Sequence, residues 1–224
     1  MSGYFQAFND SGNYLIDGVY KSFVLSRKLT VTTSVNVQSK YRYVDISVSS
    51  GEIIAIRSGV PVFLIFRSST VIRLGTNGTA ARAFTVYIFK NNPTPEDSGA
   101  GLEVYNAAGE CVYNSVQLPL NIVGIKTGLS SFTFDTSRIY AAVIISSSGT
   151  LTSAYTAVMG PNIIFHLYIG VTSGVNYVSG GIQTSNVEYY SSQSNETYSS
   201  GQSYPSYSYS GKECKIAIID VTGY

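Results

Sequence analysis

Apolar and polar residues alternate with a period of two over most of this chain, and helical periodicity is almost absent. In one example Val44, Ile46 and Val48 alternate with Tyr43, Asp45 and Ser47. Side chains of a β-strand point alternately to its two faces, so this pattern is typical of a strand with one buried face. Residues 62–66 are wholly apolar, which predicts a strand buried on both faces. The sequence therefore predicts an all-β protein built of antiparallel, sandwich-like sheets.

One hairpin pattern occurs twice, at residues 101–115 and again near the start of the chain at residues 5–18. In each copy, two alternating runs flank a short polar turn. The turn residues are Asn106 and Gly109 in the second copy, and Asn9 and Gly12 stand at the corresponding positions of the first. Glycine tolerates the left-handed conformation that such a turn needs. The copies therefore predict two hairpins of the same kind.

This repetition leaves the domain organisation open. The chain is either two related β units or one β domain with two similar hairpins, and convergence on common hairpin chemistry is a third explanation. Two prolines among polar residues at 91–99 indicate a linker or an exposed loop. The resulting division is an N-terminal β unit at 1–90, a linker or loop at 91–100, a second β unit at 101–187, an irregular Ser/Tyr-rich docking segment at 188–211, and a C-terminal strand at 212–224 that returns to the second unit.

Composition argues against several functional classes. The 224 residues carry a net charge of +1, and charged residues make up only 12% of them. No cationic run is longer than Arg27-Lys28, so we expect no nucleic-acid partner. We also expect no signal peptide and no membrane span, because the chain opens without a basic, then apolar, segment and its apolar runs are short. Low charge beside 19 tyrosines is typical of surfaces that contact other proteins, although β-rich proteins favour tyrosine anyway.

No motif for catalysis, cofactor binding or metal binding stands out. His166 is the only histidine, and it lies in an apolar segment, in a chain without a Gly-x-Ser-x-Gly motif. Cys111 and Cys214 could form a disulfide, but buried thiols are the commoner state, and with one histidine they cannot supply a structural zinc site. Glu96 and Asp97 adjoin in the proline-bounded loop, where solvated charge is the ordinary explanation. We expect a protein that is not an enzyme and has no cofactor.

Residues 188–210 change in composition to serine, tyrosine, glutamine and glycine. Ordering a backbone costs roughly 1–2 kcal/mol per residue, and serine buries little apolar area to offset it. An aromatic ring can bury ~150–250 Å², so the tyrosines have to supply the compensation. We expect them to dock on the β core or on a neighbouring protein chain, with sugar rings as the alternative ligand. The candidate interaction residues are Tyr189, Tyr190, Tyr198, Tyr204, Tyr207 and Tyr209.

The hairpin at 101–115 resembles small β-rich proteins encoded among the tail genes of tailed bacteriophages. Their hairpin has the form hydrophobic-x-hydrophobic-Asn-x-x-Gly and ends in Asp/Asn-Ser. The second copy keeps Val104-Tyr105-Asn106, Gly109 and Asn114-Ser115. The N-terminal copy departs from this ending, with Asp17-Gly18 in its place. The resemblance covers the two hairpins, and the remainder of the chain is compatible in composition.

What the resemblance implies is a non-enzymatic virion structural protein, a tail or tail-tip component that acts in tail assembly and in host attachment. Its partners would be other virion proteins in a multi-copy assembly, with a host surface glycan or receptor as a further partner. It would reside in the virion after synthesis in the host cytoplasm. A capsid decoration or other exterior virion protein and a glycan-binding β module remain as alternatives.

Overall fold

A computed structural model describes residues 6–8, 14–17, 21–37, 40–94, 101–158, 163–197, 208–210 and 213–224, and describes side chains for 21–37, 40–94, 101–149, 171–188 and 213–224. All the regular secondary structure in these residues is β-strand, and the sheets are antiparallel. They form a six-stranded sheet, a nine-stranded sheet and two two-stranded hairpins. The prediction of an all-β, sandwich-like fold is confirmed. No helix in the described residues is long and apolar enough to cross a membrane.

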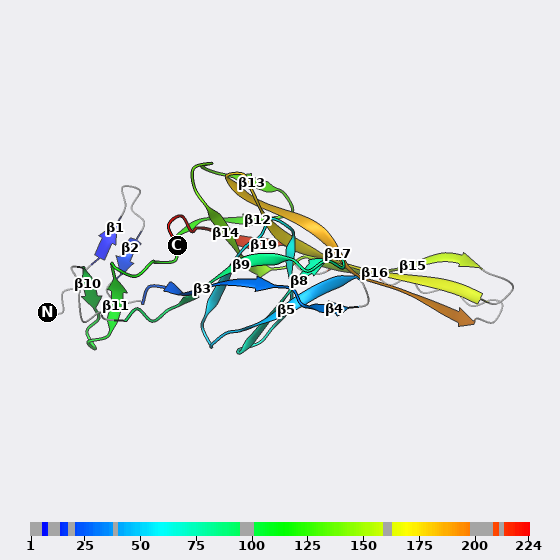
Figure 1. Cartoon of the computed structure of the whole chain (residues 1–224), viewed down its shortest axis with the longest axis horizontal. Helices are drawn as coiled ribbons and strands as arrows, with labels where there is room; N and C mark the ends of the chain where they lie inside the picture. Colours follow the sequence, from blue (N-terminus) through cyan, green and yellow to red (C-terminus); the bar gives the residue numbers. More distant parts are fainter. Residues whose placement is uncertain are drawn as a thin grey trace.

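The six-stranded sheet has the strand order β12-β19-β14-β6-β9-β3. Figure 1 shows it in the body of the molecule, beside the C-terminus. Its edge strands are β3 and β12, so each of these pairs along one side only within the sheet. The strands are β3 (Val24–Thr32), β6 (Ile53–Arg57), β9 (Ala83–Lys90), β12 (Ile122–Thr127), β14 (Tyr140–Ser146) and β19 (Lys215–Asp220).

The nine-stranded sheet has the order β13-β17-β16-β7-β8-β5-β4, and β15 and β18 join it beside β16. Its longest strands, β16 and β17, pair along their whole length and run outward from the body as a ribbon (Figure 1). The strands are β4 (Val35–Val37), β5 (Tyr41–Ser47), β7 (Val62–Arg67), β8 (Val71–Asn77), β13 (Ser131–Thr133), β15 (Gly149–Val158), β16 (Ile163–Val178), β17 (Gly181–Thr197) and β18 (Ser208–Ser210).

The Ser/Tyr-rich segment is more regular than its composition suggests. Residues 188–197 continue β17, with Glu188 opposite Val171 and Thr197 opposite Ile163, and β18 pairs with β15. The prediction of an irregular segment is therefore wrong for these residues. Low-complexity side chains do not prevent pairing, because the apolar strand β16 provides backbone partners for this stretch.

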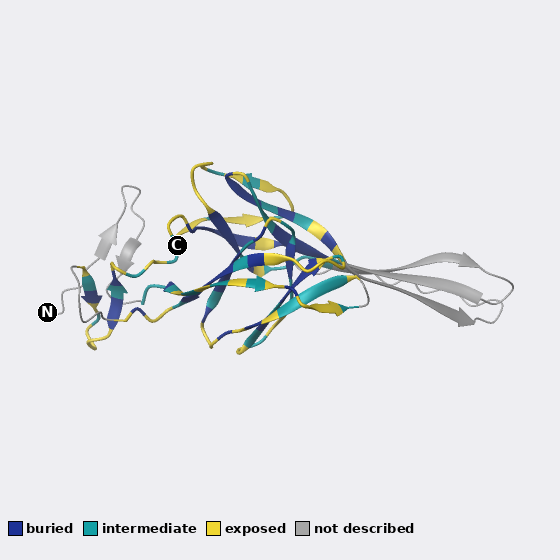
Figure 2. Ribbon diagram, viewed as in Figure 1, coloured by how far each residue is buried: buried dark blue, intermediate teal, exposed yellow. Residues whose placement is uncertain are grey.

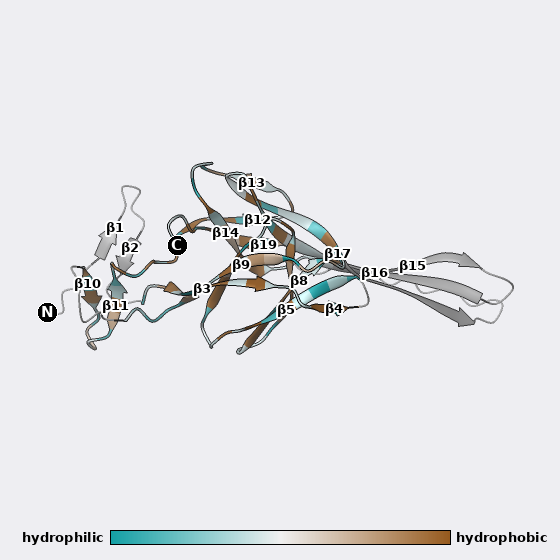
Figure 3. Ribbon diagram, viewed as in Figure 1, coloured by the Kyte–Doolittle hydropathy of each residue, from teal (hydrophilic) through white to brown (hydrophobic). Residues whose placement is uncertain are grey.

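The main core lies between the two sheets, since one cluster of buried side chains draws on strands of both. Ile54 and Ile56 enter it from β6, whereas Ile72 and Leu74 enter it from β8. Alternation along each strand places every second residue in this core. Figure 2 shows the buried residues gathered in the two-sheet body, and Figure 3 shows hydrophobic residues along the same strands.

A second buried cluster lies on the outer face of the six-stranded sheet. Ala55, Tyr87, Phe89, Ala141 and Ile219 are at most 3% exposed in this cluster. The side chains packed over them include Phe23, Leu120 and Tyr224, which lie outside the strands of the sheet. The sheet is thus covered on its inner face by the other sheet and on part of its outer face by connecting segments.

The wholly apolar strand β7 is buried along only part of its length. Val62 and Phe63 are fully buried, but Phe66 is 52% exposed. The difference follows from pairing, because β16 meets β7 only opposite Val62 and Phe63. The prediction that residues 62–66 are buried on both faces therefore holds for the first residues and is wrong at Phe66.

The two predicted hairpins form and have the same register. In the first, β1 (Gln6–Phe8) pairs with β2 (Tyr14–Asp17), and in the second β10 (Glu103–Tyr105) pairs with β11 (Cys111–Asn114). Gln6 lies opposite Asp17 as Glu103 lies opposite Asn114, and both ladders shift register one residue before the end of their first strand. Equal registers and equally placed bulges strengthen the case for a true repeat.

Strands from both predicted β units are mixed within each large sheet. In the six-stranded sheet β14 pairs with β6, and in the nine-stranded sheet β16 pairs with β7. Residues 91–100 therefore do not separate one sheet from the other. β19, from the predicted C-terminal segment, pairs with β12 and β14, both from the 101–187 range.

Candidate interaction surface

The edge strand β12 exposes apolar side chains along its length. Ile122 is 50% exposed, Val123 38%, and Ile125 56%, and Leu129 just beyond the strand is 44% exposed. These four residues are called the β12 surface below. Only one charged residue, Lys126, lies in the strand. Figure 2 shows β12 mostly in the colour of exposed residues. Several exposed apolar side chains close together along one strand are unusual on a protein that stays alone in water.

The β12 surface continues an apolar face of the sheet. Residues directly opposite each other in an antiparallel pair share a face. Ile125 lies opposite Ala217, and Ala217 lies opposite Val143, so these three residues form a row on the face that carries the second buried cluster. The neighbouring row runs from Ile122 to Ile219. The cover over this face therefore stops short of β12 and leaves Ile122 and Ile125 in solvent.

The other edges of the large sheets are short, covered or mostly polar. β17 pairs with β13 only over residues 181–183, and the rest of its outer edge, residues 185–197, is mostly polar and carries Glu188 and Glu196. β4 and β13, at the two ends of the nine-stranded path, have three residues each. β3 is longer, but it carries Arg27 and Lys28 and a register shift, and the N–H of Leu25 donates to the carbonyl of Leu118 at 2.8 Å. Short length, charge, bulges and covering segments all hinder pairing with a further strand. β12 has a register shift at its start, between Ile122 and Gly124, and runs regularly from there to its end.

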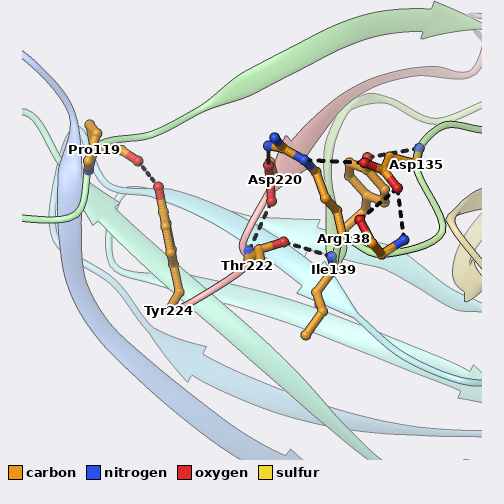
Figure 4. A network of polar contacts seen from close by, with 9 residues as sticks. Pro119, Asp135, Arg138, Ile139, Asp220, Thr222 and Tyr224 are labelled. Carbon is orange, nitrogen blue, oxygen red and sulfur yellow. Dashed lines mark hydrogen bonds and ion pairs between the residues drawn. The ribbon is translucent and has the colours of Figure 1, made fainter.

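The segment that leads into β12 is anchored by backbone hydrogen bonds. The N–H of Asp220 donates to the carbonyl of Asn121 at 3.0 Å, and the N–H of Leu120 donates to the carbonyl of Phe23 at 2.8 Å. The hydroxyl of Tyr224 donates to the carbonyl of Pro119 (Figure 4). β12 thus follows a segment that is hydrogen-bonded to the fold at several points, which suits a surface that has to present a fixed shape.

A polar network holds the C-terminal segment in place beside this anchor (Figure 4). Arg138 donates from Nη1 to Oδ2 of Asp220, whose Oδ1 accepts the N–H of Thr222 at 3.0 Å. The N–H of Ile139 donates to the Thr222 hydroxyl oxygen at 2.8 Å. Burial alone would raise the pKa of Asp220, but the hydrogen bonds from Thr222 and Arg138 outweigh it and hold the pKa below its usual value. The network is satisfied internally, which indicates a structural role.

A small groove elsewhere on the body is lined by polar side chains. It has a volume of about 290 Å³ and lies where the end of β8 approaches β17. Asn77, Arg82, Asn186 and Glu188 are exposed and line it, beside the apolar Val60 and Val187. Planar amide, guanidinium and carboxylate groups are suited to hydrogen bonding with a polar ligand.

The turn residues of the second hairpin occupy the positions that the sequence predicts. Gly109 has a φ of 77°, in the left-handed region. Oδ1 of Asn106 accepts the N–H groups of Ala108 at 3.0 Å and of Glu110 at 2.9 Å. This is the asparagine-turn chemistry that the motif indicated. The corresponding Asn9 and Gly12 lie outside the described residues.

The side chains of the predicted tyrosine site lie outside the described residues. Tyr189 and Tyr190 lie in β17 and Tyr209 lies in β18, but their side chains are outside the described residues, as are Tyr198, Tyr204 and Tyr207 entirely. Their docking therefore stays a prediction. The backbone places Tyr190 opposite Gly170 and Tyr209 opposite Leu151.

The remaining candidate residues do not gather into a reactive site among the described side chains. Cys111 and Cys214 are buried free thiols, and burial raises the pKa of Cys111. No cluster of histidine, cysteine and carboxylate side chains suited to a metal ion occurs within the described part of the chain. His166 lies in β16, opposite Tyr155 and Ser194, and its side chain is outside the described set, as are Glu96 and Asp97 entirely.

Sequence reasoning did not single out the β12 surface. Leu118, Leu120 and Ile122 alternate with other residues as in the other predicted strands, and nothing in this pattern says that the strand ends a sheet. The scarcity of charge in residues 122–127 is a weak signal that becomes informative once the edge position is known.

The chain has no match among protein-family models, curated proteins or solved structures.

Proposed function

We propose that this chain is a non-enzymatic virion structural protein, a bacteriophage tail or tail-tip component that works by contacts with other virion proteins. It is made in the host cytoplasm and functions in the virion, in tail assembly and in attachment to a host receptor or surface glycan. The observation that carries the proposal is the β12 surface. The hairpin resemblance supplies the virion context.

The physical argument is that the β12 surface gains free energy when it is covered. Burying apolar area contributes roughly 25 cal/mol per Å², and Ile122 and Ile125 are each at least half exposed. The free side of the strand also offers N–H and C=O groups to a further strand. Low overall charge, 12% of residues, fits a protein that is surrounded by other chains.

The direct test is to purify particles of a phage whose genome encodes the chain and to detect the chain by mass spectrometry. We expect it in intact virions and, after dissociation, in the tail fraction. Recovery in the capsid fraction would instead favour a decoration or other exterior protein. Absence from purified particles would overturn the proposal.

Two variants connect that assay to named surfaces. Ile125→Lys should reduce incorporation, whereas Val35→Lys, at a residue 43% exposed on an edge strand of the other sheet, should not. Deletion of residues 191–210 should also weaken incorporation, because it removes four of the six candidate tyrosines, and no described side chain of either core cluster lies in that range.

The polar groove favours a second candidate function, binding of a glycan. Its exposed amide, guanidinium and carboxylate side chains can hydrogen-bond to sugar hydroxyls. A glycan-array screen should then yield a ligand whose binding is lost in Arg82→Ala and Glu188→Ala. Arg67→Ala, a change at an exposed arginine outside the groove, is the matched control and should bind normally. A screen without a ligand would remove this candidate.

A further inference from the structure

We infer that the free edge of β12 pairs with β12 of a second copy of this chain, antiparallel and around a two-fold axis. The two six-stranded sheets then become one continuous sheet. This inference rests on the proposed function as an assembly protein and names the partner that the β12 surface meets first.

The geometry of sheets limits the registers that this pairing can have, and the inferred one is centred on Ile125. Residues opposite each other share a face, and the outer face of one copy continues as the outer face of the other. A two-fold axis perpendicular to the sheet therefore has to pass through a residue position and not between two residues. With the axis at Ile125, the Ile125 side chains of the two copies lie opposite each other, and residue 123 of one copy lies opposite Thr127 of the other.

The charge pattern of the strand fits the same register. Lys126 is the only charged residue of β12, and this register places it opposite Gly124 of the other copy. Like charges directly opposite are destabilising, and this arrangement keeps the two lysines apart. Gly124 has no side chain to crowd the lysine stem. The outer face meanwhile gains a cross-strand pair of isoleucines whose side chains are otherwise 56% exposed.

The other edges argue for self-pairing over a head-to-tail array. A chain of copies would need β12 to pair with a different edge of its neighbour. β3 carries Arg27 and Lys28 and is contacted by Leu118, and β4 and β13 offer three residues each. In the described ladders the outer edge of β17 is also unpaired beyond Gln183, but residues 185–197 are mostly polar and carry Glu188 and Glu196, so the apolar β12 finds its best match in a second β12. Two-fold symmetry also closes the assembly and prevents open-ended growth.

The size of the surface sets the expected strength. A standard interface involves about 20–30 residues and about 800 Å² on each partner, and the β12 surface is well below that size. The isolated protein should therefore be a weak dimer whose population rises with protein concentration. In a virion, other contacts would hold the copies near each other and raise their effective concentration.

Disulfide trapping tests the register directly. Opposite residues of an antiparallel pair have Cα atoms about 4.5–5.5 Å apart, within the range that a disulfide can bridge. Ile125→Cys should therefore give a covalent dimer under mild oxidation. Thr127→Cys is the matched control. The Cα atoms of residue 127 in the two copies would lie four residues apart along the strands, about 13 Å, so this variant should stay monomeric. The natural thiols interfere little, since Cys111 is 6% exposed and Cys214 2%.

Sedimentation velocity over a concentration series tests the association without a cross-link. The wild type and Val35→Lys should associate, whereas Ile125→Lys, with two cations opposite each other, should stay monomeric at every concentration. Far-ultraviolet circular dichroism shows whether each variant keeps its β-sheet signal. Cross-linking at Thr127 and not at Ile125 would overturn the register, and a wild type that stays monomeric without trapped dimers would overturn the pairing.

These results separate the inference from the proposed function. A chain found in virions that never self-associates would leave the structural role standing and refute β12 self-pairing. A chain that dimerises through Ile125 but is absent from purified particles would refute the virion role and leave the pairing intact.

Discussion

Arg27 and Glu52 form an ion pair whose loss should destabilise the fold, because one partner is buried. Nη1 and Nη2 of Arg27 donate to the two carboxylate oxygens of Glu52 at 2.8 and 3.0 Å. The Glu52 side chain is only 6% exposed, whereas that of Arg27 is 36% exposed. The N–H of Ser49 also donates to Glu52 at 2.8 Å. Arg27→Met therefore leaves a buried carboxylate with one remaining donor.

The magnitude follows from that burial. Breaking a fully buried ion pair by removing one partner costs about 3–5 kcal/mol, and a hydrogen bond to a charged group contributes about 1.5–3 kcal/mol. Because Arg27 lies partly in solvent and Ser49 still donates, we expect Arg27→Met to lower the free energy of unfolding by about 2–4 kcal/mol.

Arg73 and Asp45 provide a control with the same geometry and more solvent. Nε and Nη2 of Arg73 donate to Asp45 at 2.7 and 2.8 Å, but the two side chains are 35% and 42% exposed. Water can replace the lost donors, so the pair itself contributes little. Arg73 also stacks on Tyr43 at 4.1 Å, which adds a small stabilisation. Arg73→Met should therefore lower the free energy of unfolding by clearly less than Arg27→Met does.

Equilibrium unfolding in urea measures both changes. The chain has 19 tyrosines and no tryptophan, so tyrosine fluorescence or circular dichroism reports the transition. Linear extrapolation with an unchanged slope gives the difference in stability. The double variant Arg27→Met/Glu52→Leu should recover most of the loss, because no buried charge remains. Equal losses for Arg27→Met and Arg73→Met, or no recovery in the double variant, would refute the reasoning from burial.

Three further predictions follow from other parts of the fold. The pKa of Asp220 is held below its usual value, so its contribution to stability is present above the ordinary aspartate pKa of about 4 and is lost as pH falls through the lowered value. Unfolding free energies measured between pH 7 and pH 2 should show this loss. The loss should be smaller in the Asp220→Asn variant. Gly181→Ala should lower the unfolding free energy by about 1–3 kcal/mol or more, because the added Cβ would collide with the neighbouring strand's backbone, whereas Gly59→Ala, with open space around it, should change it by less than about 1 kcal/mol. Gly109→Ala should lower the free energy of unfolding by about 1 kcal/mol because Gly109 has a positive φ. A similar decrease for Gly12→Ala would support the repeat, whereas an unchanged free energy of unfolding would count against it.

Features that depend on short stretches of chain could be predicted from the sequence. Alternation with period two specifies a strand because side chains alternate across the backbone of any strand, whatever its neighbours are. The turn at Asn106 and Gly109 follows for the same reason, since an asparagine side chain and a left-handed glycine act within a few residues. The second hairpin and the all-β class were therefore within reach of pattern reasoning.

Which strands pair with each other was decided by the tertiary structure. Phe66 belongs to a wholly apolar run and is nevertheless 52% exposed, because β16 pairs with β7 only opposite Val62 and Phe63. Ile125 is 56% exposed because β12 ends a sheet, and the mixing of early and late strands in both sheets follows from pairings far apart in sequence. Local pattern sets the conformation of a strand, whereas its exposure depends on partners brought to it by the rest of the chain. The candidate interaction surface depends on that second kind of information, since it exists only where the pairing stops.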